Sequence, residues 1–149
     1  MARFIVDADI DQIIIPEPAA QVRTDGLWRS TCFELFLRPA GRSSYYEFNM
    51  SPSGAWAAYS FDGYREGMAD ADLEPAEPIL VANQIVRLEQ TIVLDPNGYS
   101  ALDGELEVGL SAVIEQQDGV KSYWALAHGA GPPDFHHEAC FAATLPPIG

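Results

Sequence analysis

Short runs in which apolar and polar residues alternate, separated by turn residues, dominate this chain. The longest alternating run, Leu-Trp-Arg-Ser-Thr-Cys-Phe-Glu-Leu-Phe-Leu, spans residues 27–37 and stops at a proline and a glycine. A period of two residues predicts β-strands rather than helices. By this criterion strands are expected over residues 2–8, 12–15, 27–37, 45–50, 55–61, 79–81, 85–93, 106–115, 121–127 and 141–145.

The segments between these runs carry turn and loop residues. Residues 51–54, 95–98 and 117–119 predict tight turns, and the acidic stretch 66–78 predicts a loop. No long amphipathic helix, internal repeat or linker interrupts the pattern. Many short strands with regular turns indicate an all-β protein, an antiparallel β-sandwich or barrel with little helix, in a single domain spanning residues 1–149.

Composition and charge narrow the choice of partners. The 149 residues, 48% of them hydrophobic, suffice for one ordered core. With no apolar run of about 20 residues and no signal-peptide pattern at the start, we expect a cytoplasmic protein, unless an N-terminal portion is missing. A net charge of −14 disfavours nucleic acid and anionic membranes as partners, although acidic surfaces commonly serve solubility alone.

Two cysteines, Cys32 and Cys140, lie far apart in the sequence and lack the spacing of a metal site. We expect both to be free, buried and unreactive. They could pair only if the first and last strands were neighbours.

The strand expected at residues 27–37 separates two faces. Alternation places Phe33, Leu35 and Leu37 on a core face, and Trp28 and Glu34 on the other face. An indole and a carboxylate on one face suit a sugar, which offers C–H patches and hydroxyl groups. Alternatively, the tryptophan belongs to the core, and the carboxylate, costly to bury alone, pairs with Arg29 or Arg65.

The next expected strand adds Glu47 and Asn49 on one face. Asn49 either builds the following turn or presents its amide to a ligand, and Arg65 either lines a polar site or faces solvent. Glu34 and Glu47 could form a carboxylate pair like that of glycosidases, but nothing in the sequence fixes their separation. We therefore predict a non-enzymatic protein.

All three histidines, His128, His136 and His137, lie near the C-terminus, close to Asp134 and Glu138. The spacing matches neither HxH nor HExxH, so no metal site is predicted. The chain also lacks GxSxG, P-loop and dinucleotide-binding motifs.

Several segments together resemble the bacterial DOMON-like domain proteins, which are similar to family 9 carbohydrate-binding modules. The resemblance is carried by residues 27–36, 46–59 and 64–68, with later support at residues 123–128 and 133–136. It covers nearly the whole chain and implies a β-sandwich of jelly-roll type. Members of the group usually have further sequence before the point that matches Ala2, which supports a missing N-terminal portion here.

The resemblance also suggests which residues bind a ligand. Family 9 modules hold a sugar between two tryptophans above a carboxylate; Trp28 and Glu34 match the first tryptophan and the carboxylate, and Asn49 lies near a polar position of the next strand. Where those modules have their second tryptophan, this sequence offers Phe135 and His136.

These observations favour a non-catalytic domain that binds a carbohydrate or a similar polyhydroxylated small ligand, without a cofactor. Its expected ligand-binding residues are Trp28, Arg29, Glu34, Asn49, Tyr59, Arg65, His128 and His136.

Two alternatives remain open. One is a haem-binding DOMON-type domain with axial ligands among Met50, Met68 and His128. The other is a protein-interaction domain that presents Trp56 and Tyr59 on an exposed hairpin face.

Overall fold

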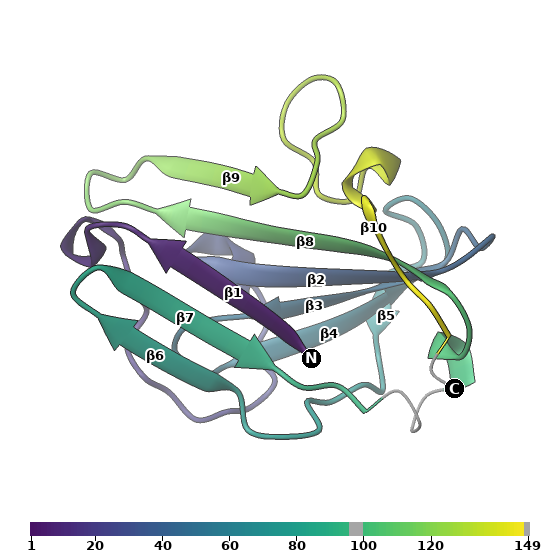
Figure 1. Cartoon of the computed structure of the whole chain (residues 1–149), viewed down its shortest axis with the longest axis horizontal. Helices are drawn as coiled ribbons and strands as arrows, with labels where there is room; N and C mark the ends of the chain where they lie inside the picture. Colours follow the sequence, from purple (N-terminus) through teal and green to yellow (C-terminus); the bar gives the residue numbers. More distant parts are fainter. Residues whose placement is uncertain (96–99, 148–149) are drawn as a thin grey trace.

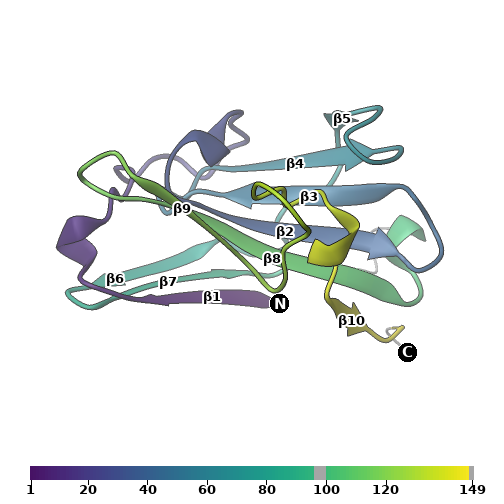
Figure 2. The same cartoon turned by 90° about the horizontal axis from the view of Figure 1, so that it is seen from above.

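The computed structural model describes residues 1–95 and 100–147, and in them two antiparallel sheets pack face to face (Figures 1 and 2). The smaller sheet has the order β1-β7-β6, formed by β1 (Ala2–Asp7), β7 (Arg87–Ile92) and β6 (Leu80–Gln84). The described residues contain no α-helix, only short 3-10 segments. The expected all-β sandwich is confirmed.

The larger sheet has seven strands in the order β10-β8-β2-β3-β4-β5, with β9 also paired to β8. Its long central strands are β8 (Leu106–Glu115), β2 (Cys32–Pro39), β3 (Tyr45–Met50) and β4 (Trp56–Phe61). Shorter strands at its edges are β5 (Ala69–Asp70), β9 (Lys121–Ala125) and β10 (Ala143–Leu145). β10 and β9 pair with opposite ends of β8, so the chain between them must cross from one end of β8 to the other.

Alternation along the strands divides the large sheet into two apolar faces. Phe33, Leu35 and Leu37 belong to the core between the sheets, as expected, and Phe4 of β1 stacks on Phe33 with ring centroids 5.0 Å apart. Phe36 belongs to a second cluster on the outer face. This outer cluster is covered by chain from the C-terminal region, including Phe135 and Phe141.

The strand expected at residues 27–37 begins later than predicted. Leu27–Arg29 is a 3-10 turn, entered through Gly26 in a left-handed conformation (φ 74°), and β2 starts only at Cys32. Glycine adopts positive φ without the steric cost that a Cβ brings. Trp28 therefore does not share the alternation of β2, although Glu34 does.

Other boundaries also differ from the sequence prediction. Residues 12–15 do not form a strand, and Ile13 makes only an isolated bridge to Gln116. The predicted strands at 121–127 and 141–145 are shorter, and those at 79–81 and 85–93 become a hairpin of β6 and β7. The predicted turn at residues 95–98 lies outside the described residues, apart from its first position. No helix of the described residues is long and apolar enough to cross a membrane.

The prediction that Trp56 and Tyr59 face solvent is wrong. Both side chains are buried, because β4 is flanked by β3 and β5 and the segment around Arg23 packs on it. The Arg23 guanidinium lies 4.9 Å from the centre of the Trp56 ring, and the Tyr59 hydroxyl donates a 2.7 Å hydrogen bond to Asp25. The hairpin thus lacks the exposed aromatic face that a docking role requires.

Candidate functional site

Polar side chains gather on the outer face of the large sheet, where strand register brings them into two adjacent rows. In one row Glu34 of β2 lies between Ser111 of β8 and Asn49 of β3. In the next row Glu47 lies between Phe36 and Tyr59. Because residues two apart share a face, the sequence alone places Glu34 with Phe36 and Glu47 with Asn49. The pairing of β2 with β3 then places these two pairs of residues side by side on the outer face.

Segments outside the sheet build walls over this polar floor. They are the 3-10 turn at Leu27–Arg29, the turn between β4 and β5, and the chain that follows β9. Floor and walls enclose a pocket of about 400 Å³, called here the outer pocket. Six of the eight residues expected to bind a ligand line it: Trp28, Glu34, Asn49, Tyr59, Arg65 and His136.

The other two expected residues lie nearby but do not line the outer pocket. The Arg29 guanidinium lies 5.4 Å from the centre of the Trp28 ring and lines a neighbouring hollow. The exposed His128 ring packs on Phe135 with centroids 6.2 Å apart, and Phe135 in turn lines the pocket. Of the three C-terminal histidines, only His136 therefore lines the outer pocket.

Among the lining residues that the sequence prediction omitted, Glu47 and Asp134 carry carboxyl groups, and Phe61 and Met68 supply apolar wall. Strand alternation had already placed Glu47 beside Asn49, so its carboxyl could have been included. Asp134 follows two prolines in a loop, and no periodic pattern identifies its partners.

The two glutamates of the floor are deeply buried, with 4% of Glu34 and 6% of Glu47 exposed. Burial raises the pKa of Glu34 to about 8, the neighbouring Glu47 adds to this rise, and Arg65 opposes it. Burial likewise raises the pKa of Glu47 to about 7, against the opposing influence of the Asn49 amide and Arg65. The alternative that Glu34 pairs with Arg29 or Arg65 is wrong, since Glu34 makes no ion pair with any described residue.

Unpartnered polar atoms lie beside these carboxyls. Both amide atoms of Asn49 and the hydroxyl of Ser111 are buried and make no hydrogen bond to a described residue, although the amide is near enough to Glu47 to influence its pKa. Buried polar groups are nearly always hydrogen-bonded, so orphans of this kind call for an explanation. Here they flank Glu34 in one row, and Asn49 lines the outer pocket, where a bound ligand would supply the partners of its amide.

A hydrogen-bonded network fixes the wall of the outer pocket that contains Arg65 and Asp134. Arg65, whose backbone φ is 54°, binds Asp134 through its guanidinium at 2.7 Å, and Tyr64 donates its hydroxyl to the same carboxylate. The backbone N–H of Arg65 donates to the Tyr45 hydroxyl at 3.2 Å. These contacts tie the turn after β4 to the chain after β9, two segments about 70 residues apart in the sequence.

His136 continues this network into the pocket. Its Nδ1 lies 2.7 Å from the Tyr45 hydroxyl, and its Nε2 lies 3.6 Å from Oε2 of Glu47. Burial lowers the pKa of His136 to about 4, and Arg65 lowers it further, so the ring is neutral at pH 7. The Tyr45 hydroxyl oxygen accepts a hydrogen bond from the backbone N–H of Arg65, so the hydroxyl proton is available for donation to Nδ1 of His136. The imidazole proton then lies on Nε2, which faces Glu47.

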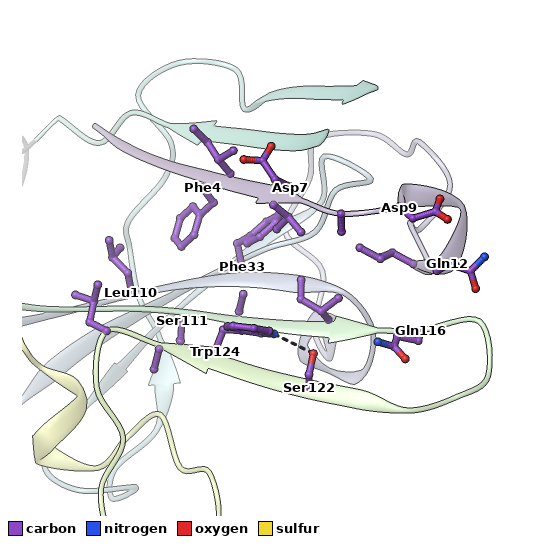
Figure 3. A pocket seen from close by; sticks show the side chains of 18 residues that line it. Phe4, Asp7, Asp9, Gln12, Phe33, Leu110, Ser111, Gln116, Ser122 and Trp124 are labelled. Carbon is purple, nitrogen blue, oxygen red and sulfur yellow. Dashed lines mark hydrogen bonds between the residues drawn. The ribbon is translucent and has the colours of Figure 1, made fainter. Parts of the chain in front are cut away.

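A second cavity of about 510 Å³ opens between β1 of the small sheet and β8 and β9 of the large one (Figure 3). Its walls are mainly apolar, with Phe4, Phe33, Leu110 and Trp124 among them, and Trp124 donates its N–H to Ser122 at 2.9 Å. Asp7 at its rim is already paired with Arg87 at 2.6 Å. Ser111, whose hydroxyl is unpartnered, borders this cleft, whereas the buried Glu34 and Glu47 carboxyls and the Asn49 amide line the outer pocket.

Comparison with known proteins supports the fold. No protein-family model and no curated protein matches the chain. The structure is similar to a crystal structure from Bacteroides uniformis ATCC 8492 described as a "putative carbohydrate-binding protein", with a TM-score of 0.51 and 18% sequence identity over 97% of this chain and 69% of that one. At this identity the similarity shows a shared fold. The resemblance to DOMON-like proteins and the jelly-roll type of sandwich stay predictions.

Proposed function

We propose that this domain binds a carbohydrate or a similar polyhydroxylated small ligand in the outer pocket, without catalysing its conversion. The observation that carries the proposal is the pairing of Glu34 with Asn49 at the floor of an open pocket, where the buried amide of Asn49 lacks hydrogen-bond partners. A ligand rich in hydroxyl groups can both donate to and accept from such groups. The description of the similar crystal structure agrees with this class of ligand.

The pocket also offers the apolar surface that a sugar ring requires. Trp28 stands at its edge with 51% of its surface exposed, which is unusual for so large an aromatic side chain. Its indole can cover the C–H face of a sugar while the polar floor binds the hydroxyl groups. Lys121 donates to the backbone carbonyl of Arg29 and so ties the 3-10 turn that carries Trp28 to β9.

Tryptophan fluorescence during titration with a panel of monosaccharides and oligosaccharides tests the proposal. The chain has three tryptophans: Trp28 in the outer pocket, Trp56 in the core and Trp124 in the apolar cleft. We expect a saturable change that persists in Trp124→Phe and is lost in Trp28→Phe. A folded protein that shows no change in fluorescence and no heat of binding with any sugar would contradict the proposal.

The haem alternative loses one of its three ligand candidates. Met50 is fully buried in the core between the sheets, so its thioether cannot reach a bound cofactor. Met68 lines the outer pocket, whereas His128 does not, so the pair does not face a common space in this pocket. No observation of the site favours haem over a polyhydroxylated ligand.

A further inference from the structure

The outer pocket carries more acidic than basic groups. Among the described residues that line it, Arg65 is the only cation at pH 7, because His136 is neutral, and the Arg65 guanidinium is already bound to Asp134. Glu34 and Glu47 therefore have no guanidinium or ammonium group as a partner within the pocket. A ligand that enters here meets two carboxyl groups whose negative charge, once ionised, is offset only in part, by the Arg65 guanidinium that is itself bound to Asp134.

The excess of acidic over basic groups continues at the mouth of the outer pocket. A neighbouring hollow shares Trp28, Tyr59 and Met68 with the outer pocket and adds two further carboxylates and one guanidinium. Together the two spaces hold five carboxyl groups and two guanidinium groups: Glu34, Glu47, Asp134, Asp25 and Asp70 against Arg65 and Arg29. A local field of this sign attracts cations and raises their concentration at the mouth.

Acidic residues alone do not make a site, but two independent features point to a ligand here. The Asn49 side chain, 1% exposed, has an unpartnered amide in the floor between Glu34 and Glu47. Aromatic rings of Trp28, Tyr59 and Phe61 line the same pocket, and the faces of such rings attract cationic groups. Hydroxyl groups of a ligand can supply the hydrogen bonds that the Asn49 amide lacks. Only a cation can form ion pairs with Glu34 and Glu47 when these are ionised.

We propose that the ligand of the outer pocket is a cationic amino sugar, whose ammonium group pairs with Glu34 and Glu47 while its hydroxyl groups bond to Asn49. The inference rests on the proposed function and specifies its ligand class. An ammonium group is a compact donor of three hydrogen bonds, so one such group can serve carboxyls from two adjacent strands. Hydrogen bonds between charged groups are roughly twice as strong as those between neutral ones.

Binding of an amine would displace protons from the pocket. Glu34 and Glu47 hold their protons up to about pH 8 and pH 7 in the free protein, and a bound ammonium favours the ionised forms. The other groups that face or border this pair are Cys32 of β2, Tyr59 of β4, Arg65, Asp134 and His136, with Asp25 and Asp70 at the mouth. Of these, Cys32 and Tyr59 titrate well above neutral pH and His136 well below it, so within this set of protein groups the two glutamates are the ones that release protons between pH 6 and 8.

Isothermal titration of the intact domain with glucosamine, glucose and N-acetylglucosamine at pH 6.5 separates amine from neutral recognition. We expect glucosamine to bind at least about tenfold more tightly than the two neutral sugars. Repeating the titration in buffers of different ionisation enthalpy should reveal release of roughly one to two protons per glucosamine at pH 6.5, diminishing towards pH 9. Glu34→Gln and Glu47→Gln should reduce the preference for the amine to about threefold or less, whereas Glu105→Gln, which removes an exposed carboxyl outside the pocket, should retain it.

The possible outcomes distinguish the two proposals. Equal binding of glucose and glucosamine, without proton release, overturns the amino-sugar inference and leaves carbohydrate binding in place. No binding of any sugar by the folded protein overturns both. Binding of calcium chloride that depends on Glu34, in a protein that ignores glucosamine, identifies the carboxyls as a metal site and overturns the inference. If a glutamine variant does not fold, proton release by the wild-type protein still decides.

Discussion

Glu34 and Asn49 lie directly opposite each other on β2 and β3, and both line the outer pocket. A carboxyl whose burial raises its pKa to about 8 thus faces an amide that has no hydrogen-bond partner. Folding places both groups in a low-dielectric floor at a cost in free energy that their mutual contacts do not offset. Such a cost is typical of a site that is completed by a ligand.

The buried carboxyls make stability depend on pH. A carboxyl whose pKa is higher in the folded than in the unfolded state stabilises the fold fully below about pH 4.5 and loses that contribution as pH rises through the folded pKa, here about 7 and 8. His136, with a pKa lowered to about 4, acts oppositely, and its contribution is lost as pH falls below 6.5. We therefore expect the melting temperature of the free protein to fall between pH 6.5 and 8.5.

Glu34→Gln should remove much of this fall, because an amide does not ionise. At pH 8.5 the variant should be more stable than the wild type by on the order of 3 kcal/mol, whereas at pH 5 the two should differ little. Thermal melts across this pH range measure the effect, with Glu105→Gln as the exposed control. Parallel pH profiles for the wild type and Glu34→Gln would show that Glu34 is not the group that titrates.

Replacing Trp28 should impair ligand binding, whereas replacing Trp56 should impair stability. Trp28 is half-exposed at the pocket edge, so Trp28→Ala should change the free energy of unfolding by less than about 1 kcal/mol and abolish ligand binding. Trp56 is 7% exposed in the core, so Trp56→Ala should cost about 3–5 kcal/mol. Urea unfolding and sugar titration of both variants test this contrast; a large loss of stability in Trp28→Ala would assign that residue to the core instead.

The cysteine thiols should be protected by the fold. Both are free, Cys32 is fully buried with a pKa well above the usual thiol value because of burial, and the Cys140 thiol lies 3.3 Å from the backbone carbonyl of Asp134. Thiolates are the reactive species, so a thiol reagent at pH 8 should label the native protein slowly. Both thiols should react promptly in denaturant. Fast labelling of Cys32 in the native state would indicate that the pocket floor opens readily.

Local pattern predicted the parts of the site that lie on regular strands. β3 and β8 have the boundaries that alternation gave them, and the separation of Phe33 from Glu34 onto opposite faces follows from the pleat alone. The pattern failed where one residue redirects the backbone, as Gly26 does before Trp28. Trp28 nevertheless lines the pocket, but through the 3-10 turn and not through alternation on β2.

The walls of the pocket could not be derived from periodicity, because loops supply them. Asp134 is positioned by Arg65 and Tyr64, and His136 by Tyr45, all from a distant part of the sequence. Such contacts depend on the path of the chain after β9, which long-range packing determines. The path of the chain after β9 also explains why His136 lines the outer pocket and His128 does not, although the two lie close together in the sequence.

Gly109 determines how closely that C-terminal chain approaches the sheet. It lies opposite Phe36 on the outer face, and a Cβ at this position would lie 3.0 Å from the carbonyl oxygen of Cys140 and 3.3 Å from the Cβ of Phe36. Gly109→Ala should therefore push the 3-10 segment Glu138–Cys140 outward and destabilise the fold by about 1–3 kcal/mol. Because Asp134 and His136 precede this segment, ligand affinity should fall as well.

Gly63→Ala is the matched control, since a Cβ there meets only the Glu66 carboxylate at an ordinary 3.7 Å. Chemical unfolding and ligand titration of both variants compare stability with binding. Wild-type stability and affinity in Gly109→Ala would mean that the chain after β9 adapts without moving the pocket wall. Reduced affinity in Gly109→Ala, beside normal affinity in Gly63→Ala, would show that close packing on β8 holds Asp134 and His136 where the ligand needs them.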